Sequence, residues 1–223
     1  MTDSTVELMP AGEDGVAVLT IQRAQKKNAL SIAVRDAMSD ALDSLATDES
    51  CRVAVITGAG DVFSAGFDLD EFNQPERADE LWASSERWHR TLLEFPLPSV
   101  AAINGPAYGG GFDLAVMCDL RVACESAVFA HPERVFVDVV YAPLREIVGG
   151  AVAREVALTG RRITADEALT LGLVTRVVPP ASVLEEARVL AAEIAATPRD
   201  VLGRMKAKIL RRAGIAPGNT LDL

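Results

Sequence analysis

Three consecutive glycines follow a short apolar run in the stretch PAYGGGFDLAVMCDL, residues 106–120. Glycine loses more conformational entropy on folding than any other residue, and it has no side chain to pack. The chain therefore needs these glycines for a turn that other residues resist or for a close approach to the backbone. The preceding residues 98–105, PSVAAING, are a continuous apolar run that is typical of a strand buried on both faces.

A second buried strand is followed by a similar turn. Residues 52–58, RVAVITG, lead into AGDVFSAGFDL, residues 59–69. Either turn alone is also consistent with an ordinary tight turn. The third glycine of a dinucleotide-binding fingerprint is replaced by Phe63, and no G-x-S-x-G motif surrounds Ser64. Together, glycine turns and a helix N-terminus can direct backbone N–H groups at one oxygen, so the pair predicts a site that stabilises an oxyanion.

The rest of the chain predicts one α/β unit with a helical C-terminal appendage. We expect strands over residues 16–22, 52–58, 98–105 and 173–179, helices over 31–47 and 79–94 with Ser31 as a cap, two short strands with a turn near Glu125 and Ser126, glycine-punctuated helices over 145–172, and a helical tail over 182–213 broken at TPRD. We place the core in residues 1–180 and a shortened C-terminal helical region in residues 181–223.

Composition narrows the class of protein. The net charge is −10, from 22 basic and 32 acidic residues, which disfavours nucleic acid as a partner. No apolar run is long enough to cross a bilayer, and the first ten residues lack the features of a secretory signal. Three cysteines favour a reduced, cytoplasmic protein over a disulfide framework. The two histidines lack metal-ligand spacing, so we expect no metal site.

Four segments, which follow one another in this order along the chain, resemble segments of a known family. They are FSAGFDL (63–69), INGPAYGGGFDLAVMCDLRVA (103–123), FAHPE (129–133) and LTGRRITADEALTLGLVTRVVP (158–179). With QRAQKKNALS (22–31), they resemble the crotonase family, the enoyl-CoA hydratases and isomerases. The resemblance implies a spiral of β-β-α units with a helical trimerisation region, a homotrimer or a dimer of trimers, and an acyl-CoA substrate of fatty acid metabolism with no separate cofactor.

The resemblance also implies the site. The backbone N–H groups of Phe67 and Gly110 form the oxyanion hole, and the glycines let an amide meet the thioester oxygen without a Cβ in the way. Asp113 and Glu133 are the two catalytic carboxylates. Further contacts to the substrate and its CoA are expected at Lys26, Lys27, Asn28, Ala29, Leu30, Ala65, Gly66, Asp68, Leu69, Asp70, Gly109 and Gly111. Phe136, Val140 and Tyr141 either line the acyl pocket or belong to the ordinary core.

Several functional alternatives stay open. The first is hydration of a 2-trans-enoyl-CoA through an enolate. Asp113 is one methylene shorter than the family's glutamate, which draws its carboxylate back by about 1.5 Å and leaves double-bond isomerisation or other enolate chemistry as the second alternative. Asp113 could otherwise serve only as a charge at a helix N-terminus, and Glu133 as a surface carboxylate. The third alternative, in which both carboxylates have only those roles, is a non-catalytic acyl-CoA-binding protein.

Overall fold

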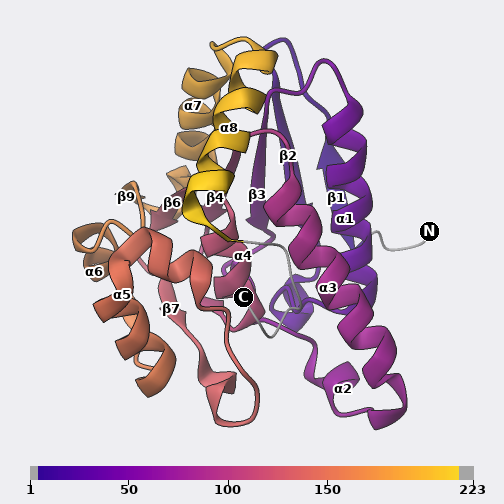
Figure 1. The fold of residues 1–223 in the computed structure, drawn as a ribbon, viewed down its shortest axis with the longest axis vertical. Helices are drawn as coiled ribbons and strands as arrows, with labels where there is room; N and C mark the ends of the chain where they lie inside the picture. Colours follow the sequence, from indigo (N-terminus) through magenta and orange to yellow (C-terminus); the bar gives the residue numbers. More distant parts are fainter. Residues whose placement is uncertain (1–4, 216–223) are drawn as a thin grey trace.

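The computed structural model describes residues 5–215, and its centre is a six-stranded sheet (Figure 1). The strand order is β1 (Val6–Met9), β2 (Val16–Ile21), β3 (Val53–Gly58), β4 (Ser99–Ile103), β6 (Leu120–Cys124) and β9 (Arg176–Val178). Only the edge strand β1 runs antiparallel to its neighbour. Every residue of β3 and β4 is buried, as their continuous apolar runs predicted.

A smaller sheet stands beside the first. It contains β5 (Ala107–Tyr108), β7 (Val128–Ala130) and β8 (Ile163–Thr164), with β7 in the middle. The strand β5 pairs in parallel with β7, which pairs antiparallel with β8. The pair β6 and β7 confirms the two short strands that were predicted around the turn at residues 125–126.

Helices cover the large sheet on both sides (Figure 1). Helices α1 (Ile32–Thr47) and α3 (Ala78–Glu94) pack against each other, and α1 also contacts β1 and β2. The predicted cap is confirmed, because the Val34 N–H donates to the Ser31 hydroxyl oxygen over 3.3 Å. The remaining helical segments are η1 (Ala24–Lys26), α2 (Leu69–Phe72), η2 (Pro75–Arg77), α4 (Gly110–Met117), η3 (Pro132–Val135), α5 (Ala142–Thr159), α6 (Ala165–Thr170) and η4 (Pro180–Ser182).

The C-terminal helices are anchored to the core. Helix α7 (Val183–Ala195) contacts β2, β3, β4, β6 and β9, so it belongs to the packing of the large sheet. Helix α8 (Arg199–Ala213) is held by Lys206, whose Nζ lies 2.6 and 2.7 Å from the two carboxylate oxygens of Asp119. The helical tail and its break before Arg199 are therefore confirmed. The boundary at residue 180 stays a prediction.

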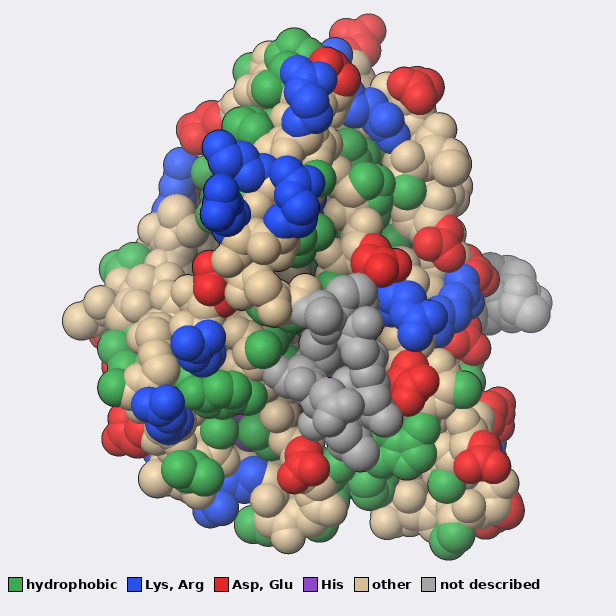
Figure 2. Space-filling view, in the orientation of Figure 1, with side chains coloured by type: hydrophobic (Ala, Val, Ile, Leu, Met, Phe, Trp, Pro, Cys, Tyr) green, Lys and Arg blue, Asp and Glu red, His purple; other side chains and the backbone are tan. Residues whose placement is uncertain are grey.

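The surface charge is uneven. Figure 2 shows Lys and Arg side chains gathered over α8, where Arg204, Lys208, Arg211 and Arg212 are exposed. This local excess of positive charge occurs in a chain whose overall charge is −10.

Within residues 5–215, each helix is too short or too polar to cross a membrane.

The topology brings the glycine turns together. The strands β3, β4 and β6 are parallel, so the segments that follow them begin at the same edge of the sheet. Two isolated bridges tie the loop after β3 to its neighbours, because Ser64 pairs with Ala107 and Phe67 pairs with Leu30, which precedes α1. The loop after β3, the N-terminus of α4 and the segment after β7 consequently meet at one place.

Candidate active site

A cavity of about 250 Å³ lies where these segments meet. The loop after β3, the start of α4, η3 and one face of α3 contribute to its wall. Its lining residues are Ala65, Gly66, Phe67, Leu69, Phe72, Trp82, His89, Gly109, Gly110, Asp113, Pro132, Glu133, Phe136, Val137, Asp138 and Val140. Most of them are apolar, and the side chains with polar groups are those of His89, Asp113, Glu133 and Asp138, besides the indole N–H of Trp82.

The glycines are required by close contacts between protein segments. A Cβ on Gly110 would lie 2.8 Å from a carbon of the Phe67 ring, and one on Gly109 would lie 3.0 Å from Glu133 Oε2. Gly109 also has a φ of +52°, a backbone conformation that residues with a side chain rarely adopt. Neighbouring protein atoms therefore require glycine at both positions, and the expectation that the glycines also let an amide meet a thioester oxygen stays a prediction.

The two predicted oxyanion amides lie next to each other. A Cβ on Gly66 would lie 3.1 Å from the Gly110 nitrogen, so the peptide that leads into Phe67 adjoins the start of α4. Gly110 is the first residue of α4, and its N–H has no acceptor within the helix. The helix dipole adds positive potential at this end. The arrangement suits an oxygen on which negative charge develops.

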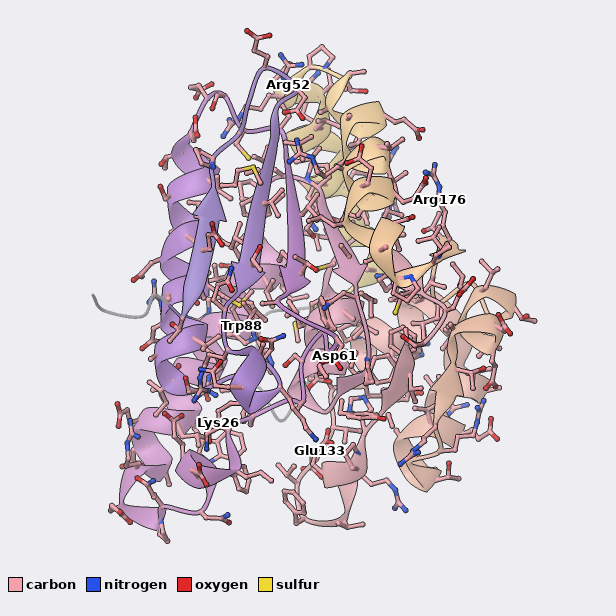
Figure 3. All side chains as sticks on the ribbon, turned by 180° about the vertical axis from the view of Figure 1, so that it is seen from behind. Lys26, Arg52, Asp61, Trp88, Glu133 and Arg176 are labelled. Atoms are coloured by element: carbon pink, nitrogen blue, oxygen red, sulfur yellow. The ribbon has the colours of Figure 1, made fainter. Side chains whose placement is uncertain are left out.

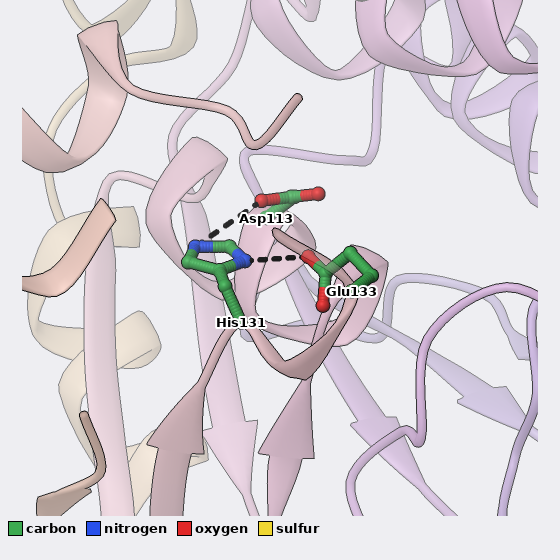
Figure 4. A group of neighbouring side chains, drawn as sticks. All are labelled: Asp113, His131 and Glu133. Atoms are coloured by element: carbon green, nitrogen blue, oxygen red, sulfur yellow. Dashed lines mark hydrogen bonds and ion pairs between the residues drawn. The ribbon is translucent and has the colours of Figure 1, made fainter. Parts of the chain in front are cut away.

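Both predicted carboxylates line the cavity, and His131 lies between them (Figure 4). Its Nδ1 is 2.8 Å from Glu133 Oε1, and its Nε2 is 3.7 Å from Asp113 Oδ1. The His131 ring is fully buried and stacks on Phe112, with 4.7 Å between ring centroids. Sequence reasoning missed His131, although its place two residues before Glu133 in FAHPE is a signal that was available.

The surroundings of Asp113 and His131 shift the pKa of both groups. Burial raises the pKa of Asp113 to about 7, while the charge of His131 opposes that rise. Burial acts to lower the pKa of His131, but the neighbouring charges of Asp113 and Glu133 outweigh it and raise that pKa. A carboxyl group with a perturbed pKa in a cavity, as Asp113 has here, is typical of catalytic sites.

The same group could hold a cation in principle. One ligand atom each from Asp113, His131 and Glu133 lies within 4.8 Å of the others. However, His131 Nδ1 is already engaged with Glu133 Oε1, so a metal ion that used this nitrogen would have to displace that hydrogen bond. The absence of a metal site stays a prediction.

Several predicted contact residues lie outside the cavity wall. Lys26 and Asp70 form an exposed ion pair of 3.0 Å, and Lys26 lies in the same half of the molecule as Glu133 (Figure 3). The Asn28 amide donates to the carbonyl oxygens of Ala59 and Val62, so it holds the loop after β3 in place. The others outside the wall are Lys27, Ala29, Leu30, Asp68 and Gly111.

At the apolar end of the cavity, the predicted residues divide between the two alternatives. Phe136 and Val140 line it, whereas Tyr141 is absent from the wall and packs against the core. Phe72 and Trp82 were missed. Phe72 makes edge contacts with Trp82 and Phe136, at centroid distances of 6.2 and 5.6 Å. Trp82 and His89 are seven residues apart on α3, a spacing that places both on one helix face and that the sequence already contained.

The sequence and the fold match known proteins. The family model for enoyl-CoA hydratase/isomerase matches residues 11–218. A putative enoyl-CoA hydratase of Thermus thermophilus is 41% identical over 192 residues, which cover 81% of this chain and 74% of that protein. A 2,3-dehydroadipyl-CoA hydratase of Escherichia coli is 37% identical over 193 residues, covering 85% and 76%.

A solved structure has the same fold as this chain. The enoyl-CoA hydratase of Bacillus anthracis superposes with a TM-score of 0.88 at 30% identity, covering 98% of this chain and 87% of that one. The predicted crotonase-like fold is therefore confirmed. The chain is an enzyme of the hydratase/isomerase type, and it belongs to the enoyl-CoA hydratase/isomerase family, the crotonases.

Proposed function

We propose that this enzyme adds water to the double bond of a 2-trans-enoyl-CoA thioester and forms a 3-hydroxyacyl-CoA. One observation carries the proposal. Asp113 and Glu133 both line the cavity that Phe67 and Gly110 also line. An enoyl thioester held at those amides would have its Cα and Cβ near the two carboxylates.

The two carboxyl groups divide the proton transfers of hydration between them. Glu133 takes a proton from a water molecule as the water oxygen bonds to Cβ, and the electrons of the double bond move onto the thioester oxygen. The amides of Phe67 and Gly110 stabilise that enolate. Asp113 has a pKa of about 7 and so carries a proton in part of the molecules at neutral pH. It donates this proton to Cα, and exchange with solvent restores both carboxyl groups.

The acyl group is proposed to be neutral and apolar. Among the described residues, the lining contains no Lys or Arg, and its charged members are Asp113, Glu133 and Asp138. A second carboxylate on the acyl chain would meet like charge and lose its hydration without gaining a partner. We expect kcat/KM for a dicarboxylic enoyl-CoA to be at least about tenfold below that for a straight-chain enoyl-CoA of equal length.

The test compares a 2-enoyl and a 3-enoyl thioester with wild type, Glu133→Gln and Asp113→Asn. Glu133→Gln keeps the shape and removes the base, so hydration should fall by on the order of 10²–10⁴ with little change in binding. Asp113→Asn should remove hydration while leaving any isomerisation by Glu133 in place.

Matched controls are available on the surface. Glu125→Gln and Asp79→Asn make the same chemical changes at exposed positions away from the cavity wall, and both should hydrate as wild type does. An Asp113→Asn variant that hydrates as fast as wild type would remove Asp113 from the reaction and favour isomerisation.

A further inference from the structure

The contacts of His131 are unusual for a core histidine. Its side chain is fully buried, yet its two ring nitrogens face Glu133 and Asp113. It sits at the N-terminal boundary of η3, and Glu133 follows within the first turn. The ring therefore fills a position between both carboxylates, and its face is fixed by the stacking on Phe112.

We propose that His131 is a positioning residue, which holds the Glu133 carboxylate in one orientation and couples its charge to that of Asp113. This inference rests on the proposed function, because the hydration reaction uses both carboxylates. His131 contacts the two acidic side chains and needs no contact with the substrate itself.

The hydrogen bond between His131 and Glu133 sets the orientation of the Glu133 carboxylate. His131 Nδ1 is 2.8 Å from Glu133 Oε1, which leaves Oε2 as the oxygen available for reaction. Oε2 has no hydrogen-bond partner among the described residues, and it lies 3.0 Å from the position of a Cβ on Gly109. A free glutamate side chain has several rotamers, and one hydrogen bond to a fixed ring selects among them.

The coupling of charge follows from the second contact. His131 Nε2 and Asp113 Oδ1 are buried, are 3.7 Å apart, and have no hydrogen-bond partner among residues 5–215. The charges that act on the His131 ring come from Asp113 on α4 and Glu133 on η3, while the packed face of Phe112 is apolar. The imidazole of His131 faces both acidic side chains, so the protonation of His131 and that of Asp113 depend on each other.

The first experiment compares two variants. His131→Phe keeps a ring to stack on Phe112 and removes the hydrogen bond, and we expect kcat to fall by on the order of 10² with a threefold change in KM at most. His131→Gln supplies an amide donor for Glu133 Oε1 but no ionisable group. It should recover kcat to within about tenfold of wild type and lose the ionisation that His131 contributes to the pH–rate profile. Glu125→Gln is the control and should match wild type.

The second experiment needs no turnover. NMR titration of the imidazole resonances, with His131 assigned by its loss in His131→Gln, should show protonation persisting to higher pH than in free histidine. In Asp113→Asn this midpoint should move to lower pH. A His131 midpoint that is the same in both proteins would overturn the coupling.

The outcomes separate the two proposals. If wild type fails to hydrate any 2-enoyl thioester, the proposed function is wrong, and the NMR result still tests the coupling. If both His131 variants lose activity and thermal stability equally, His131 is only a core residue and the positioning role is refuted. Wild-type kcat and pH dependence in His131→Phe would refute it as well.

Discussion

Gly110→Ala tests whether the Phe67 and Gly110 amides work as a pair. The new Cβ would lie 2.8 and 2.9 Å from two carbons of the Phe67 ring, whereas ordinary contact begins at 3.4 Å. The loop that carries Phe67 and the start of α4 must therefore separate by about 0.6 Å. The Phe67 ring also packs on the buried Arg35 guanidinium, 4.5 Å from its centroid, which limits how the ring can yield.

The expected loss follows from this displacement. A misplacement of about 1 Å at a reacting centre can cost 10²-fold in rate, so we expect kcat/KM to fall by roughly tenfold to a hundredfold. The free energy of unfolding should fall by up to about 2 kcal/mol, because a gain of about 1 kcal/mol from the better helix former offsets only part of a crowding cost of about 1–3 kcal/mol. Steady-state hydration is followed through the loss of absorbance of the conjugated thioester, and unfolding through circular dichroism.

Gly203→Ala provides the matched control on α8. Its Cβ would lie 3.7 Å from the nearest atom, so the substitution should stabilise the protein by about 1 kcal/mol and leave turnover unchanged. If Gly110→Ala hydrates within twofold of wild type while folding normally, the thioester oxygen does not sit at this amide pair. The amides of Phe67 and Gly110 would then not form the oxyanion hole.

Three further predictions concern charge. Because the folded pKa of Asp113 is raised to about 7, its contribution to stability is present at low pH and is lost as pH rises toward 7. Asp113→Asn should therefore raise the free energy of unfolding more at pH 8 than at pH 4 in urea titrations, and an equal effect at both would contradict the burial argument. Lys206→Met breaks a partly buried pair with Asp119 and should cost about 1–3 kcal/mol, while exposed Lys208→Met should change the melting temperature little. A Lys206→Met protein as stable as wild type would show that α8 is held by other contacts. Lys26→Gln should weaken acyl-CoA binding by about two- to threefold at low salt, since this exposed cation is already paired. Calorimetry at high salt should erase that difference, and a salt-independent loss would rule out an electrostatic contact.

The sequence alone predicted the central strands and the main helices, and it indicated candidate residues for the site. Continuous apolar runs predicted β3 and β4, since a strand buried on both faces has no polar side to alternate with. Ser31 marked the start of α1, because its hydroxyl satisfies a free N–H of the first turn. The ordered motifs, through their resemblance to a family, indicated Phe67, Gly110 and both carboxylates.

Only the tertiary structure decided how distant segments meet. It placed His131 between Asp113 and Glu133, brought Phe72 and Trp82 to the wall of the cavity, and left Tyr141 in the core. Periodicity and capping report the few residues around one position, whereas these contacts join α4, η3 and α3 across long stretches of chain. The crowding of Gly110 against Phe67 is likewise a property of two packed segments, and the side-chain volume that causes it lies far from GGG in the sequence.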